Sequence, residues 1–112
     1  MLNKDLHCLE AILEAIGRIE EYSADYDNAD DFNEDYRNFD ACMMNFVVIG
    51  EMVEKLSADF KTTYSSIDWK KIKGFRNIVA HDYFGIDAEE VWQIIKERLP
   101  VLKNDISRIL DI

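Results

Sequence analysis

The sequence predicts an all-α protein, and three observations support that prediction. Only four Gly and one Pro occur among 112 residues, too few turn-forming residues for a β-sandwich or a barrel. Apolar residues make up 48% of the chain, enough to bury a core in one domain of this length. They recur at steps of three and four residues, which is the period of amphipathic helices. We therefore expect residues 1–112 to form a single domain, an antiparallel bundle of four main helices.

The first two helices are predicted on either side of a strongly acidic segment. Apolar residues at helical spacing indicate helices over residues 3–22 and 33–57. Residues 20–40 hold nine acidic residues and a single basic one, and within this segment we expect a loop at 24–31. A break without a helix is expected at 57–66, where the helical period is lost.

The third helix is predicted to start at Trp69 and to continue towards Gly85. The carboxylate of Asp68 can cap it by accepting the free amide hydrogens of the first turn. Gly74 lies inside this helix, where Gly is about 1 kcal/mol less favourable than Ala. We expect either a close helix–helix contact or a junction between two short helices at Gly74.

The last helical stretch has a clear start and a predicted interruption. Asp87 and Glu90 have the spacing of a capping box. Pro100 removes one backbone donor, so we expect the helix to be kinked or split there.

Charge and cysteine content limit the possible partners and location. The formal net charge is −10, so most of the surface repels nucleic acid and anionic membranes. There is neither a signal-peptide run nor an apolar stretch of membrane-spanning length. We expect a cytoplasmic protein without a membrane partner.

Cys8 and Cys42 fall in apolar-periodic segments and are predicted to be reduced thiols of the core.

One basic cluster interrupts the acidic chain, and a histidine follows it. The cluster consists of Lys70, Lys71, Lys73 and Arg76, and the histidine is His81. Cleavage of a phosphodiester without metal needs a group that exchanges protons near neutral pH, for which imidazole is suited. It also needs fixed positive charge on the reacting phosphate, for which guanidinium is suited. Five helical steps turn by about 140°, so Arg76 and His81 would not share a face of one regular helix.

The residues alone leave structural interpretations open. Arg76 could equally be a surface residue in an ion pair, since most arginines are exposed. A histidine such as His81 also suits the end of a helix, where carbonyls lack partners. Tyr83 could simply be a half-buried packing residue. His7 has no neighbour in sequence that suggests chemistry, and the acidic segment lacks the ligand spacing of a calcium-binding loop.

The string from Arg76 to Tyr83 resembles the Arg-X4-His-X-Tyr motif of the HEPN superfamily, and most closely that of its HepT-like toxin branch. The flanking sequence is similar to the same family over about residues 45–106. The similar positions are Ile49-Gly50-Glu51, Lys55-Leu56-Ser57, Trp69-Lys70-Lys71-Ile72, Gly74, Arg76-Asn77, Tyr83-Phe84-Gly85-Ile86-Asp87, Leu99-Pro100 and Leu102.

This resemblance implies a HEPN-type helical domain that forms a two-fold homodimer, with both motifs facing one cleft. Such proteins are toxins of two-gene toxin–antitoxin modules of type II or VII, and they cut RNA without metal or cofactor. Their antitoxin is a small nucleotidyltransferase. The alternative from another class is a non-catalytic helical dimer that is a binding partner or substrate of a nucleotidyltransferase, a role that the net charge favours.

The resemblance also implies a role for each residue of the motif region. Arg76 and His81 are the implied catalytic residues of an endoribonuclease or a nuclease acting on RNA ends. Asn77 and Glu51 are implied to support them, and Tyr83 is the implied site of AMPylation by the antitoxin. The implied ligands of the RNA backbone are Lys70, Lys71 and Lys73.

Overall fold

The computed structural model describes all 112 residues, and every regular element in it is helical. The long helices are α1 (Asn3–Ser23), α3 (Tyr36–Lys55), α5 (Trp69–His81) and α7 (Leu99–Leu110). The shorter elements are α2 (Ala29–Glu34), α4 (Ala58–Thr63), the 3₁₀ turn η1 (Tyr83–Gly85), α6 (Ala88–Gln93) and the π-helical turn η2 (Ile94–Arg98). The prediction of an all-α protein is confirmed.

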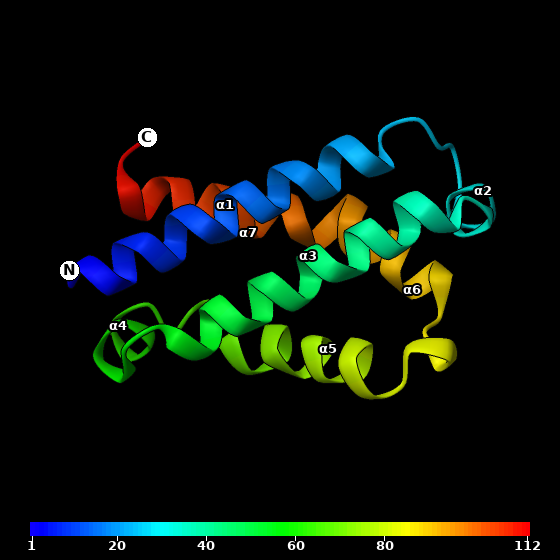
Figure 1. Ribbon diagram of the computed structural model, residues 1–112. Coiled ribbons are helices and arrows are strands. Elements are labelled where there is room, and N and C mark those ends of the chain that lie inside the picture. The colour runs from blue at the N-terminus through cyan, green and yellow to red at the C-terminus, as the bar shows by residue number, and fades with distance from the viewer.

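Helix α3 lies between α1 and α5 and runs antiparallel to both (Figure 1). Helix α7 packs against α1, and α6 packs against α2. The start of α1, the end of α3, the whole of α4 and the start of α5 gather at one end of the molecule (Figure 1). We call this the α4 end. The end of α1, α2 and the start of α3 lie at the opposite end, which we call the α2 end.

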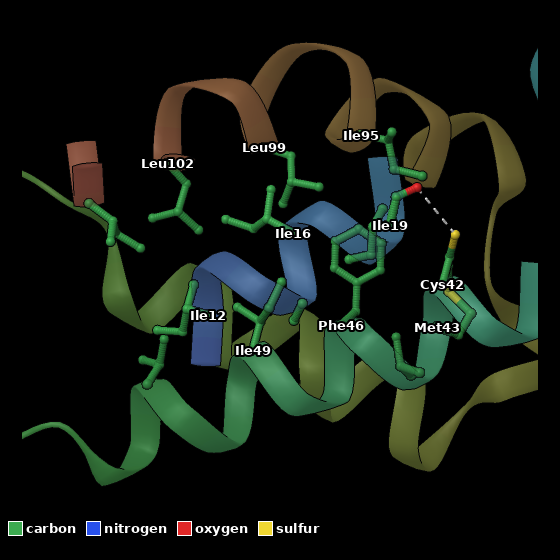
Figure 2. Close-up of a cluster of buried hydrophobic side chains, with 14 of the residues drawn as sticks. Ile12, Ile16, Ile19, Cys42, Met43, Phe46, Ile49, Ile95, Leu99 and Leu102 are labelled. Carbon is green, nitrogen blue, oxygen red and sulfur yellow. Dashed lines mark hydrogen bonds between the residues drawn. The ribbon is translucent and has the colours of Figure 1, made fainter. Parts of the chain in front are cut away.

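The core fills the space between α1, α3 and the C-terminal helices (Figure 2). Its labelled side chains are Ile12, Ile16, Ile19, Cys42, Met43, Phe46, Ile49, Ile95, Leu99 and Leu102. Burying each large apolar side chain contributes roughly 1.5–3 kcal/mol. Both cysteines are free and buried, as predicted. Burial raises the pKa of Cys42 to about 12, so its thiol is inert in the folded protein.

The acidic segment contains a helix that the sequence pattern did not predict. Part of the expected loop forms α2, which Asn28 caps by accepting a hydrogen bond from the Asp31 amide at 2.9 Å. Phe32 on α2 is fully buried and packs against Phe39 and Trp92. Burial of this one aromatic side chain stabilises a helix that is too short to show a hydrophobic periodicity in the sequence. Consequently α3 starts at Tyr36, later than predicted.

The expected break at 57–66 was also wrong in part, because α4 forms within it. Ser57 caps α4 by accepting a hydrogen bond from the Phe60 amide at 3.2 Å. Phe60 is buried and stacks at a tilt on Tyr64, with ring centroids 4.8 Å apart. As in α2, one buried aromatic side chain stabilises a short helix.

The predicted explanations for Gly74 were wrong. Helix α5 runs unbroken through this residue, and a Cβ there would have no neighbour within 4 Å. The close helix contact lies at Gly50 on α3 instead, where a Cβ would be only 2.2 Å from the Cβ of Arg76. The start of α5 is as predicted, since Asp68 accepts a hydrogen bond from the Lys71 amide at 3.0 Å. The helix ends at His81, before the predicted Gly85.

The helix predicted to kink or split at Pro100 instead changes type just before that residue. Asp87 caps α6 by accepting a hydrogen bond from the Glu89 amide at 3.0 Å. The helical path widens into η2, and α7 follows with Pro100 as its second residue, which has no amide hydrogen to donate to the preceding turn. No helix of the structure is both long and apolar enough to cross a lipid bilayer.

Candidate functional site

Arg76 is held at the crossing of α5 and α3. Its Nη1 donates a hydrogen bond to the carboxylate of Glu51 and forms an ion pair with it. The aliphatic part of the Arg76 side chain lies against Gly50, where any side chain would collide with it. The Arg76 side chain is 17% exposed and that of Glu51 is 45% exposed. The guanidinium is therefore fixed at the edge of the helix crossing, with one side open to solvent.

Only part of the guanidinium of Arg76 is satisfied. Its Nε is buried and has no hydrogen-bond partner, and an unpaired buried donor costs about 1–3 kcal/mol. Nη2 forms no hydrogen bond within the chain either. The guanidinium therefore keeps hydrogen-bond donors that Glu51 does not use.

His81 and Asn77 lie on the outer surface of α5. His81 is the last residue of the helix, Asn77 precedes it by one turn, and both are exposed. Arg76 instead faces α3, as the five-residue offset from His81 predicts. No hydrogen bond joins Arg76 to His81 within one chain.

The three lysines occupy the first two turns of α5 and differ in their partners. The Nζ of Lys73 lies 2.6 Å from Oε2 of Glu54 on α3. This hydrogen bond lowers the pKa of Glu54 below its usual value. Lys70 and Lys71 are exposed and form no ion pair. The positive charges of Lys73 and Arg76 are thus each offset by a carboxylate of α3.

Tyr83 lies in η1, just beyond α5, and its hydroxyl donates a hydrogen bond to Asp40 on α3. Its half-buried ring packs edge-on against Phe39, with centroids 6.4 Å apart. Burial, together with the hydrogen bond to Asp40, raises the pKa of Tyr83 above its usual value. The hydroxyl therefore stays protonated at neutral pH. Asp40 could not be predicted as a site residue, because nothing in the local sequence links it to the motif.

The exposed face of α3 beside Glu51 is apolar. Met44 is 63% exposed, and Val47 and Val48, one turn further along, are half-buried. On α5, Ile78 is 47% exposed.

No three His, Cys, Asp or Glu side chains of the structure are arranged as a metal ion would require.

An all-α fold with an Arg-X4-His-X-Tyr motif at the end of one helix defines the HEPN class of proteins. Within this class, the chain belongs to the HepT-like ribonuclease family. Residues 12–109 match the family described as "Ribonuclease HepT-like".

Three relatives show how far the similarity extends. The "Gamma-glutamylcyclotransferase and putative RNase" of Methanocaldococcus jannaschii is 35% identical over 92% of this chain, which spans only 46% of that protein. A "Putative RNase" of the same organism is 33% identical over 86% of this chain and 87% of its own length. The "Probable ribonuclease HepT" of Thermococcus cleftensis is 33% identical over 90% of this chain and 91% of its own. No solved structure matches the chain.

Proposed function

We propose that this protein is the toxin of a toxin–antitoxin module, a ribonuclease that cleaves RNA without metal in a cleft formed by two copies of the chain. The observation that carries the proposal is the state of Arg76. Its guanidinium is held by Glu51 against Gly50 and keeps donors that no group of the chain uses, and His81 is exposed on the same helix. Membership of the HepT-like ribonuclease family supports RNA as the substrate.

The proposed reaction is an intramolecular phosphoryl transfer within RNA. The 2′-hydroxyl oxygen attacks the adjacent phosphorus, the bond from phosphorus to the 5′-oxygen breaks, and a cyclic phosphate and a 5′-hydroxyl result. One imidazole takes the proton of the 2′-hydroxyl, and an imidazole returns a proton to the departing oxygen. Arg76 stabilises the charge that develops on the phosphate oxygens. Asn77 positions the phosphate, and Lys70 and Lys71 hold the backbone without reading sequence.

Two features support a homodimer as the active form. Arg76 and His81 lie on different faces of α5, so a partner's His81 can complete the site. Met44, Val47 and Val48 on α3 and Ile78 on α5 are apolar side chains at the surface that a second copy would bury. Joining two copies also doubles the local positive charge in an otherwise acidic protein.

Cleavage of a fluorescent single-stranded RNA in EDTA tests the nuclease. The wild type should cut, and Arg76→Ala and His81→Ala should each slow cleavage by about 10²–10³ with the fold intact by circular dichroism. Arg18→Ala, an exposed arginine of α1 paired with Glu14, is the matched control and should cut normally. Loss of wild-type activity in EDTA, or normal cutting by His81→Ala, would refute the mechanism.

Light scattering tests the dimer, which should have about twice the mass of the 13.1 kDa chain. Met44→Glu and Ile78→Glu should shift it towards the monomer. Val101→Glu, at a 58% exposed position on α7, should not. Mixed dimers of Arg76→Ala and His81→Ala chains should regain activity if each site takes its arginine and histidine from different copies. Full activity in a clean monomer would contradict the shared cleft.

The antitoxin of this module is proposed to be a nucleotidyltransferase that transfers AMP from ATP to the hydroxyl of Tyr83, releasing pyrophosphate. The added phosphate would attract Arg76 and block the approach of RNA. Intact-protein mass spectrometry after co-expression should detect AMP on the wild type and none on Tyr83→Phe. Full neutralisation of Tyr83→Phe would show instead that the antitoxin acts by occlusion.

A second candidate is a non-catalytic dimer that only binds a nucleotidyltransferase or serves as its substrate. The pairing of Arg76 with Glu51 and of Lys73 with Glu54 favours it, because both cations already have carboxylate partners. An absence of RNA cleavage, combined with AMP transfer to Tyr83, would establish this second function.

A further inference from the structure

The charge of the protein is divided between its two ends. Residues 20–40, with nine acidic side chains and one basic, occupy the α2 end (Figure 1). Most of the lysines lie at the α4 end, on the start of α1, the end of α3, α4 and the start of α5. They are Lys4, Lys55, Lys61, Lys70, Lys71 and Lys73. The same end also carries the carboxylates of Asp5, Glu54, Asp59 and Asp68, so its positive charge is concentrated around the lysines.

A cavity opens at this end, between the start of α1 and the end of α3. It has a volume of about 600 Å³, and its basic lining residues are Lys4, His7 and Lys55. Met52 and Leu56 contribute apolar wall. The cavity brings His7, for which the sequence suggested no chemistry, together with two lysines.

The lysines of the cavity are not neutralised by ion pairs. Neither Lys4 nor Lys55 lies within ion-pair distance of a carboxylate. The one acidic lining residue, Glu54, is bound to Lys73. Asp5 lies behind the wall, 2% exposed, and accepts hydrogen bonds from the Ser57 amide at 2.8 Å and the Ser57 hydroxyl at 2.7 Å.

Cys8, which also lines the cavity, lies within reach of the charges of Asp5, Lys55 and Lys4. Burial and the Asp5 carboxylate raise the pKa of the Cys8 thiol, while the charges of Lys55 and Lys4 oppose that rise. Both ammonium charges therefore reach the same wall, although the residues are far apart in sequence.

The cavity is also close to the proposed nuclease site. Lys55 follows Glu51, the partner of Arg76, by four residues on α3, which is one helical turn or about 6 Å along the axis. The cavity and the proposed nuclease site therefore lie about one turn apart along α3.

We propose that the cavity lined by Lys4, His7 and Lys55 is a second anion-binding site, which holds a backbone phosphate of single-stranded RNA outside the cleft. The lysines contact the phosphate oxygens, His7 adds a hydrogen-bond donor, and the apolar wall at Met52 covers part of the ribose or base. The inference rests on the proposed ribonuclease function, because it concerns how the same substrate is held.

Binding of a fluorescent 2′-O-methyl RNA, measured by anisotropy over a series of salt concentrations, tests the site. This RNA lacks the 2′-hydroxyl nucleophile, so binding is measured whether or not the protein cleaves RNA. The double variant Lys4→Gln/Lys55→Gln should bind roughly tenfold more weakly at low salt, and the slope of log K against log salt should fall by about 1.4. Both lysines are exposed, so the fold should be unaffected.

The matched control is Lys96→Gln/Lys103→Gln, which removes the same charge from the C-terminal helices. Lys96 lies over the Trp92 ring, and Lys103 is paired with Glu20. Equal weakening by the two double variants would overturn the proposal, since only net charge would then matter. ATP could also compete with the RNA. If ATP bound as tightly as the RNA, and if its binding were lost in Lys4→Gln/Lys55→Gln, the cavity would instead be a pocket for free nucleotides and the proposal would be overturned. Binding that depends on Lys4 and Lys55 without any cleavage of natural RNA would support the site and refute the nuclease.

Discussion

Gly50 on α3 and Arg76 on α5 are in direct contact where the two helices cross. A Cβ on Gly50 would lie 2.2 Å from the Cβ and 2.4 Å from the Cγ of Arg76, well inside any real contact distance. The absence of a side chain at Gly50 thus allows the stem of Arg76 to lie flat on α3 while the adjacent Glu51 binds its guanidinium. The position of the predicted catalytic arginine is set by a glycine on another helix.

Gly50→Ala should destabilise the protein by about 1–3 kcal/mol, because the added methyl group forces α3 and α5 apart. It should also slow RNA cleavage, since Arg76 moves with α5. Gly74→Ala is the matched control, because a Cβ there meets nothing within 4 Å and Ala should stabilise α5 by about 0.5–1 kcal/mol. Urea denaturation of both variants gives the comparison. If Gly50→Ala were as stable as the wild type, α3 and α5 would be able to accommodate a side chain at position 50 where they cross.

Glu51→Gln should lower the kcat of RNA cleavage by about tenfold, because the guanidinium of Arg76 loses its charged anchor and is less well oriented. KM should not rise, since a negative charge near the phosphate is removed at the same time. Glu14→Gln, in the exposed pair with Arg18, provides the control for the chemical change. Steady-state kinetics on a short RNA separate the two constants. A raised KM with unchanged kcat would mean that Glu51 assists binding rather than orientation.

Tyr83 should ionise only at a pH above that of an ordinary tyrosine, because burial and the Asp40 hydrogen bond raise its pKa. The folded protein keeps this proton where the unfolded chain loses it, at a pH near 10. Its stabilising contribution is therefore complete below about pH 10 and is lost as the pH rises through the folded value. Ultraviolet titration of tyrosinate, as the difference between wild type and Tyr83→Phe, measures the pKa. Asp40→Asn should lower the pKa of Tyr83. An unchanged pKa would rule out the hydrogen bond between Tyr83 and Asp40.

Asp5 should stabilise the fold mainly through its two hydrogen bonds from Ser57. Burial opposes ionisation of Asp5, but the Ser57 hydrogen bonds and the Lys4 charge outweigh it, so its pKa is lowered. Asp5→Asn should cost about 1.5–3 kcal/mol at neutral pH. That difference should shrink as the pH falls below about 4 and Asp5 takes up its proton. Denaturation of Asp5→Asn and of the exposed control Asp59→Asn, at pH 7 and in acid, measures this. If the loss of unfolding free energy in Asp5→Asn were the same at both pH values, the hydrogen bonds from Ser57 would not depend on the charge of Asp5.

The sequence by itself predicted those features that depend on a few neighbouring residues. The apolar period identified the long helices, Asp68 identified the start of α5, and Pro100 indicated an irregularity in the last helix. The motif from Arg76 to Tyr83 indicated the family that the comparison then showed. These signals are local because a helix period, a cap and a missing amide hydrogen each act within one or two turns.

Local signals could not predict α2 and α4. Each has six residues, too few for a period, and each is stabilised by one buried aromatic side chain, Phe32 or Phe60, that packs on distant elements. Gly74 was misinterpreted for a related reason. The conformational cost of a glycine inside a helix can be estimated from the sequence. Whether a neighbouring helix approaches so closely that only glycine fits depends on how the helices pack.

Only the tertiary structure decided the partners of the predicted site. Glu51 lies 25 residues from Arg76, and Asp40 lies 43 residues from Tyr83. Ser57 is 52 residues from Asp5, whose charge borders the proposed second site. These contacts depend on the crossing and register of α1, α3 and α5, which follow from packing of the whole core rather than from any one segment. The sequence thus indicated which side chains are proposed to act on RNA, and the packing of α3 decided how Glu51 and Asp40 contact them.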